Sequence, residues 1–578
     1  MTTYAQELAG EHKAVCMIWD FPDLDTRFVT QLHDGLSLPS GYTQFVGAVP
    51  RSDAGSRLDV MSGKLTVGGT SFEIPDESQA VTAWLKDHDA ELHLTRVVRK
   101  DGFIGVAEAG YQETRWVFED TEVSGKQGGG YAIKLANALK AMNRGLYEDF
   151  DGESYRLDET AHPTGLGPSA TTITLEKSPK SQWREPGNAI LWNEDAKLIE
   201  LVTYQTIGGT GNKDLQTVTR QKYAVGDSSF TFPQDNSQIW QVWVKRGNPV
   251  DLMLEWLTTT EAGGNGSYDQ ADGDGLGLDT WFLDLTAIED VRDDYWTQPT
   301  FNGSDHLTAG TAVLFVEKKP IRDVKRWIED HILRPFALFP ATENDERFSI
   351  ETYYRVPPNT IDIGNEWEVG QFNASQWRRN YRNRINNLRL LTDWNPAEGE
   401  HDVSVPKLQN ASNDRFGKAK AEEIACRGGR TGRLGFPDYG SDDNVQTSAS
   451  RLLLEAANPW TPLKIKAFYK HKDIGLTDAV TINIPNVPNL RTGQRGTDSG
   501  DLFLVIRRRV VLDADRIHGH VELEIRLRRP VLRPAIVASD TAADNYSAAS
   551  PADKQNGCYV TPGDTAQFDN GDEGYTIP

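Results

Sequence analysis

The sequence predicts a multi-domain, mainly β protein with an α/β middle region. The chain has 578 residues, which is too long for a single hydrophobic core, so several domains are expected. Short segments that alternate apolar and polar residues, separated by glycine-containing turns, recur near both ends of the chain. Segments with helical spacing lie in the middle, around residues 248–257 and 320–336. Together these predict two β-barrel or β-sandwich domains, one N-terminal and one near the C-terminus, with a small β-module and an α/β domain between them.

The N-terminal β-barrel domain is expected at residues 1–150. Between residues 27 and 125 the period-two segments are RLDVMSGKLTVGG, ELHLTRVVRKDGFIGVAEAG and TRWVFEDTEVSG. The segment YAIKLANALKAMNRGLY follows, with Leu135, Leu139 and Met142 at helical spacing. We therefore expect a helix after the barrel.

A small β-module is expected at residues 165–245. Its strand-like segments are TTITLEK, AILWNEDAKLIELVTYQTIGG, DLQTVTRQKYAV and QIWQVWVKR. The sequence GGTGNKD within it is a glycine-rich turn between two strands. With no helix after it and no GK[ST], it does not fit a phosphate loop.

The α/β middle domain is expected at residues 246–360. A helix should begin at Asn248-Pro249, a side-chain cap followed by proline at the first helical position. A second helix should start at Pro320, and RFSIETYYRV should form a strand. The apolar positions expected to be buried are Val250, Met253, Leu254 and Leu257 in the first helix and Ile321, Val324, Ile328 and Ile332 in the second.

Three further segments complete the expected domain organisation. A mixed connector domain at 361–458 should hold a strand in NRINNLRLLTDW and helices in GKAKAEEIAC and ASRLLLEAA. A second β-barrel domain at 459–535 contains PLKIKAFYK, DAVTINIP, DLFLVIRRRVVLD and HVELEIRLRRP, in the last of which apolar and charged residues alternate strictly. An extended C-terminal segment at 536–578 is rich in Ala, Asp, Gly and Ser, so we expect a partner or a neighbouring copy to hold it.

Charge and cysteine usage limit the classes of function. Lys plus Arg number 61 and Asp plus Glu 84, a net charge of −23, which disfavours stable wrapping of nucleic acid but allows DNA to pass close by. The three cysteines are far apart and show no CxxC spacing, so neither a disulfide framework nor a zinc site is suggested. Without a signal-peptide pattern or an apolar run approaching 18 residues, we expect neither signal-peptide export nor stable membrane association.

The acidic stretch EAGGNGSYDQADGDGLGLDTWFLD, residues 261–284, is the candidate metal site. Carboxylates are the ligands that calcium prefers, and the weak candidates here are Asp269, Asp272, Asp274 and Asp279, with Asp284 beyond them. An EF-hand starting at Asp272 would place Leu276 at position 5 and Leu283 at position 12, so that pattern fails. A different calcium loop and a solvated turn rich in glycine both remain open. We favour the turn and predict no metal site.

Two other clusters have competing interpretations. His518 and His520 could hold zinc if a third ligand converged, but alternate positions also share one strand face by default. The segment WRRNYRNRINNLR, from Trp377 to Arg389, suits single-stranded nucleic acid or an interface that binds acidic neighbouring surfaces.

Catalytic signatures are missing from the sequence. Asp293 and Asp294 could serve glycoside hydrolysis only at a suitable separation in space. No GxSxG, HExxH or Cys/His nucleophile pattern is present. Tryptophans could line sugar sites, although four of them are more simply core residues: Trp192, Trp240, Trp243 and Trp256. We expect no enzyme activity, no catalytic residues and no cofactor.

Several segments, in a fixed order, resemble a known family. The segments TTITL, GNAILW, LIELVTYQTI and LQTVTRQ precede PVDLMLEWLTTTEAGGNGSYDQADGDGLGLD, and NRINNLRLLTDWN and CYVTPGDTAQFDNGDEGYTIP follow. This succession resembles the baseplate or tail-tip hub proteins of long-tailed (siphovirus-type) bacteriophages and gene transfer agents. The resemblance runs from about residue 165 onward and is weaker over the N-terminal barrel. It departs from the family at Gln221-Lys222, where Arg-Gly is frequent, and at Gly574, where proline is usual.

The resemblance implies a structural hub at the tail tip or baseplate of the virion, assembled in the host cytoplasm. Such a hub is a homotrimer that closes the tail tube, the two barrels of each chain giving a ring of six. It opens for DNA ejection during host entry, with DNA passing transiently and without specific binding. Its implied partners are a distal tail protein or tail-tube ring, the tape-measure protein, and tail fibre or central tip proteins.

Two functions from other classes are alternatives. One is a carbohydrate-binding or carbohydrate-active tail protein that uses tryptophans and acidic residues on host surface glycans. The other is a peptidoglycan-cutting tip protein, against which the missing catalytic signatures count.

Overall fold

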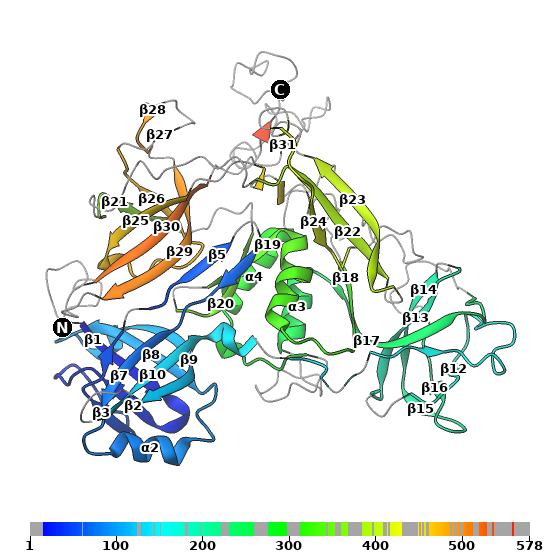
Figure 1. Cartoon of the computed structure of the whole chain (residues 1–578), viewed down its shortest axis with the longest axis horizontal. Helices are drawn as coiled ribbons and strands as arrows, with labels where there is room; N and C mark the ends of the chain where they lie inside the picture. Colours follow the sequence, from blue (N-terminus) through cyan, green and yellow to red (C-terminus); the bar gives the residue numbers. More distant parts are fainter. Residues whose placement is uncertain are drawn as a thin grey trace.

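The computed structural model describes residues 15–536 with gaps, and residues 558–559. Gaps longer than four residues fall at 124–128, 221–230, 259–274, 297–311, 353–359, 368–383, 430–448, 513–518 and 529–534, and shorter ones occur elsewhere. The described chain is mainly β, with several sheets around a central group of helices (Figure 1). This confirms the predicted fold class.

The N-terminal sheet has eight strands within the described residues, in the order β3-β2-β1-β8-β9-β10-β7-β4. β3 continues through Gly47 and Ala48 into β4, so the two ends of this order belong to one chain segment and the sheet curls into a barrel. Aromatic rings fill its interior, where Trp19 stacks on Phe72 with ring centroids 4.3 Å apart. The bounds are β1 Val15–Phe21, β2 Thr26–Val29, β3 Thr43–Val46, β4 Val49–Pro50, β7 Thr70–Pro75, β8 Arg96–Phe103, β9 Gln112–Val123 and β10 Gly130–Asn137.

Helix formation around this barrel differs from the prediction. The helix expected over YAIKLANALKAMNRGLY is wrong for its first half, because residues 130–137 form β10, which pairs with β7 and β9. Leu135 enters the barrel core, whereas Leu139 and Met142 follow on the 3₁₀ turn η3 (Ala138–Met142) and enter the central core. The actual helix, α2 (Ala80–His88), was not predicted; its Trp84 packs edge-on against aromatic rings of the barrel.

The small β-module contains the strands expected of it. β13 (Gly187–Asn193) lies between β14 (Leu198–Tyr204) and β17 (Ser237–Gly247), and β17 also pairs with β11 (Tyr155–Arg156) and β18 (Ala312–Glu317). A second sheet has the order β12-β16-β15, with bounds Thr172–Thr174, Asp214–Gln216 and Thr206–Gly208. β15 and β16 form a hairpin, so GGTGNKD is the inter-strand turn predicted.

The middle region holds the main group of helices. α3 (Pro249–Thr258) starts as predicted, since the Asn248 Oδ1 accepts a hydrogen bond of 2.8 Å from the Val250 amide. The second predicted helix begins later than expected, because Asp323 caps α5 (Val324–Ile328) while Ile321 bridges to Leu146. α5 continues into the π-turn η6 (Glu329–Leu333) and the 3₁₀ turn η7 (Arg334–Phe336). The other elements are η4 (Thr280–Phe282), α4 (Leu285–Trp296), β19 (Leu338–Thr342) and β20 (Phe348–Thr352).

The second barrel is built from strands distant in sequence. Its order is β21-β26-β29-β30-β25, with bounds Thr360–Gly364, Ala479–Ile482, Leu502–Leu512, Gly519–Arg528 and Pro462–Phe468. Trp367, just after β21, bridges Ala467 in β25, so this sheet also closes on itself. Val521, Leu523 and Ile525 point into its apolar interior, as the alternation predicted. The hairpin of β27 (Pro488–Asn489) and β28 (Gln494–Arg495) extends from it.

The connector region contains a three-stranded sheet, in the order β23 (Glu400–Leu408), β22 (Asn387–Asn395), β24 (Glu422–Ala425). The helix predicted in GKAKAEEIAC is wrong, because residues 422–425 pair in parallel with β22 and bury Ile424 in the central core. The helix predicted in ASRLLLEAA agrees with the described residues there: Ala449, Leu452, Leu453 and Ala456 are helical and buried.

Two further features complete the described chain. β31 (Ala535–Ile536) and β32 (Cys558–Tyr559) pair in parallel. Of the helices that are described, none is long and apolar enough to span a membrane.

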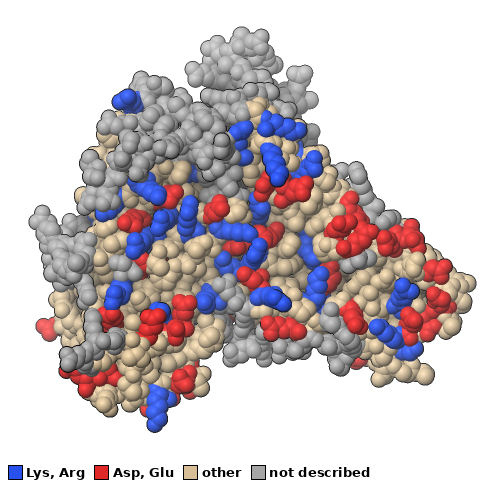
Figure 2. Space-filling model, viewed as in Figure 1, with Lys and Arg blue, Asp and Glu red and all other residues tan. Residues whose placement is uncertain are grey.

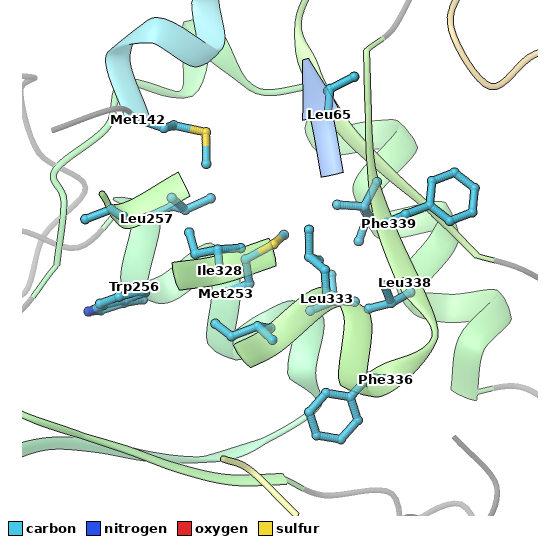
Figure 3. Close-up of a cluster of buried hydrophobic side chains, with 14 of the residues drawn as sticks. Leu65, Met142, Met253, Trp256, Leu257, Ile328, Leu333, Phe336, Leu338 and Phe339 are labelled. Carbon is cyan, nitrogen blue, oxygen red and sulfur yellow. The ribbon is translucent and has the colours of Figure 1, made fainter. Parts of the chain in front are cut away.

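The central core joins these parts. Side chains from α3, α5, η6, η7 and β19 pack around Met253, Trp256 and Leu333 (Figure 3). Leu65 reaches this cluster from β6, far away in the sequence. β5 (Ser56–Asp59) and β6 (Lys64–Thr66) form a hairpin that leaves the first barrel and enters the space between the barrels and the helices (Figure 1).

Candidate functional site at the barrel junction

The hairpin of β5 and β6 connects the two barrels. Ser56 and Arg57 of β5 pair with Arg508 and Arg507 of β29 in the second barrel, more than 400 residues later in the chain. Just before β5, the Asp53 amide donates to the Val510 carbonyl at 3.2 Å. Gly55 has φ +84°, and a Cβ there would lie 3.0 Å from the Arg508 carbonyl oxygen, so this crossing requires glycine. The hairpin that leaves the first barrel therefore extends the sheet of the second barrel.

Arg99 lies at the centre of a buried charge network beside this crossing. It comes from β8 of the first barrel, and its Nη2 is 2.8 Å from Asp101 Oδ2 on the same strand. Its Nη1 donates to Asp53 Oδ1 at 3.0 Å. Lys472, from the turn after β25 in the second barrel, brings its Nζ to 3.5 Å from Asp101 Oδ2. Opposite charges from both barrels thus meet away from water, which is tolerated only when they are paired and hydrogen-bonded.

Arg508 extends the network to the middle region. Its Nη1 donates to Glu346 Oε1 at 2.6 Å, and its Nη2 donates to the Lys472 carbonyl at 2.8 Å. Glu346 lies between β19 and β20 and accepts a further hydrogen bond of 2.8 Å at Oε2 from Asn137 Nδ2 of the first barrel. The Arg508 and Glu346 side chains are 11% and 5% exposed. This one carboxylate therefore links the first barrel, the second barrel and the middle region.

Burial perturbs the titration of the network. Burial raises the pKa of Asp101, of Glu346 and of the neighbouring Asp473 above their ordinary values, although basic partners oppose this. Burial also lowers the pKa of Lys472 to about 7, with the positive charge of Arg508 acting in the same direction. Burial thus disfavours the charged forms that the ion pairs need.

A second buried ion pair joins the β-module to the connector sheet. Arg427, just after β24, donates from Nη1 to Glu317 Oε2 at 2.7 Å, and its guanidinium lies 3.9 Å from the centre of the Trp394 ring. The Trp394 indole donates to the other oxygen of Glu317. Burial alone would raise the pKa of Glu317, but Arg427 and Trp394 bring it below its ordinary value. Burial, with Arg427 nearby, lowers the pKa of His331 to about 3, so this imidazole is neutral.

The end of the acidic stretch anchors the middle region to the first barrel. Asp279 accepts a hydrogen bond of 2.9 Å from the Trp281 amide, and Arg96 of β8 lies 3.7 Å from its carboxylate. Arg115 of β9 donates to the Trp281 carbonyl at 2.7 Å and lies over the indole ring. Asp284 accepts from Arg347 at 2.7 Å. These two carboxylates stabilise a turn and an inter-domain contact.

The other metal candidates, Asp269, Asp272 and Asp274, lie outside the described residues. Within the described part of the chain, no group of three or more His, Cys, Asp or Glu side chains is placed to hold a metal ion. A calcium site in the acidic stretch therefore stays an open alternative to the turn.

The structure describes only parts of the histidine pair and of the arginine-rich segment 377–389. His518 and residues 377–383 lie outside the described residues, and His520 has its Nε2 3.9 Å from Glu522. Arg384 donates to the Gly417 carbonyl at 2.8 Å, and Arg389 lies 3.5 Å from Glu423 on β24, both within the connector region.

The structure describes one of the two carboxylates considered for glycoside hydrolysis and the four tryptophans considered for sugar sites. Asp293 is exposed and pairs with Arg292, while the Asp294 side chain is outside the described part. Four tryptophans are buried in cores, as expected: Trp192, Trp240, Trp243 and Trp256.

Sequence reasoning missed the network, although one signal for it was present. In β8, Val97, Arg99 and Asp101 alternate with more exposed residues, so the two charged residues occupy positions in phase with an apolar one. A charge pair at inward positions of a strand indicates a buried ionic contact. Which residues from distant segments would complete it was not visible in the sequence.

No protein-family model matches this chain, and no curated protein matches it. Among the similar solved structures are three described as tail proteins. The 43 kDa tail protein of prophage MuSo2 from Shewanella oneidensis has 8% identity and a TM-score of 0.32, over 84% of this chain and 98% of that one.

Two further tail proteins have similarly low sequence identities and TM-scores. The tail protein from Neisseria meningitidis MC58 has 9% identity and a TM-score of 0.32, over 83% and 98% of the two chains. Prophage tail protein gp18 from Listeria monocytogenes EGD-e has 7% identity and a TM-score of 0.29, over 88% and 94%. At TM-scores this low the likeness does not establish a shared architecture.

Proposed function

We propose that the chain is a structural protein of a phage tail, acting as a hub that closes the tail tube at the tip or baseplate as a homotrimer. The observation that carries this proposal is the pair of barrels from opposite ends of the chain, joined through β5 and β29. Two barrels in each of three chains would give a ring of six. The resemblance of the ordered sequence segments to hub proteins supports the same function.

The chemistry of the junction suits assembly. Its charged side chains form ion pairs with one another: Arg99 pairs with Asp53 and Asp101, and Arg508 pairs with Glu346. The pair of Lys472 and Asp101 joins the two barrels, and the pair of Arg508 and Glu346 joins the second barrel to the middle region. We therefore propose a role without turnover, in which the hub connects the tube to fibres or tip proteins and opens for DNA ejection.

Imaging of particles tests the proposal. Tail particles purified from cells that produce the chain with a small tag would be labelled with a tag-specific antibody fragment and examined by cryo-electron microscopy. The expected result is three labels around the tube axis at the tail tip. Label on the head or along the tube wall, or a single or two-fold arrangement, would refute the hub.

A further inference from the structure

The outer face of the second barrel is basic, although the chain carries a net charge of −23. Antiparallel partners share a sheet face, and one row across the strands reads Arg57, Arg507, Glu524, Lys464. The next row reads Arg509, Glu522, Lys466. We call this surface the basic face, with the members Arg57, Lys464, Lys466, Arg507 and Arg509.

Arg57 and Arg507 are directly opposite each other across the barrel junction. Like charges in this position destabilise a strand pair. Of the two carboxylates within the rows, Glu524 is buried and Glu522 is partly exposed. Arg57 and Lys464 are exposed. The face therefore has an excess of positive charge that a bound anionic surface would neutralise.

A surface of opposite charge lies on the same face of the molecule, over the β-module and the connector sheet (Figure 2). It consists of the β13–β14 turn and the β22–β23 turn with the start of β23, and its exposed members are Glu194, Asp195, Glu398, Glu400 and Asp402. We call these the acidic turns. Trp394, at the end of β22, packs against the β13–β14–β17 sheet and holds the two turns together. Figure 2 shows Asp and Glu gathered in this region, and Lys and Arg prominent over β5, β29 and β30.

We propose that the basic face of one copy binds the acidic turns of the next copy. Each chain carries both surfaces, so the contact is heterologous and closes when the rotation between copies closes a ring. This inference rests on the proposed homotrimer and names the surfaces that build it. Phe468, two residues after Lys466 on β25, is 47% exposed and gives the basic face an apolar residue.

Nucleic acid is the less suitable occupant of the basic face. Glu522 and Glu524 lie among the basic residues of the rows, so the positive charge does not form the continuous track that a phosphate backbone follows. A second copy supplies carboxylates at fixed positions, where each can pair with one basic side chain of the rows.

Charge reversal in the full-length chain tests the contact. The basic face would be reversed by Arg57→Glu with Lys464→Glu, and the acidic turns by Glu400→Lys with Asp402→Lys; a fourth protein would combine all four. Sedimentation velocity over a range of concentration and salt would measure self-association. Lys86→Glu with Lys140→Glu, exposed positions on α2 and η3 beside the first barrel, is the control with the same charge change as the reversed basic face.

Each one-sided reversal should weaken self-association by about tenfold or more, because like charges then face each other. The combined variant should recover wild-type association, and the control should not differ from wild type. Added salt should dissociate the wild-type oligomer.

An oligomer that none of the reversals alters would overturn the assignment of these surfaces and leave the trimer intact. A wild-type chain that stays monomeric at every concentration would overturn both the inference and the proposed trimer. Salt-sensitive binding of a duplex DNA probe that Arg57→Glu with Lys464→Glu abolishes, without any effect on self-association, would assign the basic face to nucleic acid instead.

Discussion

Removing the positive charge from the junction should destabilise it strongly. Arg508→Met keeps a long apolar stem but leaves Glu346, 5% exposed, without the guanidinium 2.6 Å away. Breaking a buried pair by removing one partner costs about 3–5 kcal/mol, because a charge is left buried without compensation. Protonation of Glu346 would relieve part of this cost, since burial already raises its pKa. We therefore expect a loss near the lower end of that range, about 3 kcal/mol.

The double variant Arg508→Met with Glu346→Gln isolates the ionic contribution. Glutamine keeps an oxygen that accepts from Asn137 but carries no charge. We expect the double variant to recover most of the lost stability, to within about 1–2 kcal/mol of wild type. Urea unfolding and hydrogen exchange of the β5 and β29 amides would measure the stability of both variants. A loss below about 1 kcal/mol for Arg508→Met, or equal losses in both variants, would refute the role given to this pair.

Three further outcomes are expected. Burial lowers the pKa of Lys472 from 10.5 to about 7, so the unfolded chain binds more protons than the folded chain between these pH values. The free energy of unfolding should therefore rise with pH across this window, by up to about 1.4 kcal/mol per pH unit. Lys472→Met should flatten that slope in melting curves recorded at several pH values. Trp256→Ala should cost about 3–5 kcal/mol in urea unfolding, since its side chain is fully buried in the central core, and a loss near zero would contradict that packing. Calcium and chelator should leave the melting temperature unchanged; a chelator shift that Asp274→Asn abolishes would show a calcium site.

Period-two alternation predicted most strands of both barrels, because each strand has one face in an apolar core. β30 is the clearest case, with Val521, Leu523 and Ile525 all buried inside the second barrel. The helix cap at Asn248 was also predictable, since its partner, the Val250 amide, is only two residues away. Local rules succeed where the deciding contacts are local.

The wrong helix predictions arose where distant partners decide the structure. Leu135, Leu139 and Met142 have helical spacing, but the first belongs to β10 and the other two enter a different core after a turn. The residues of β24 have good helix propensity, yet pairing with β22 places Ile424 in the central core. Tertiary packing overrides propensities of a few tenths of a kcal/mol per residue. The charge network was equally out of reach, because its members are up to 455 residues apart, from Asp53 to Arg508.

The two kinds of contact around the β5–β6 hairpin differ in how they respond to separation. Leu58 and Leu65 join the hairpin to the apolar central core, and exposing that surface to water would be unfavourable in proportion to its area. The contact between the barrels combines a two-residue strand pairing and the Lys472–Asp101 ion pair with apolar contacts, because Leu512 and Tyr469 of the second barrel pack against apolar clusters of the first. On separation its charges regain hydration, which offsets much of the lost attraction. Separating the barrels would also expose Leu512 and Tyr469 to water, so the apolar contacts oppose opening more than the charges do.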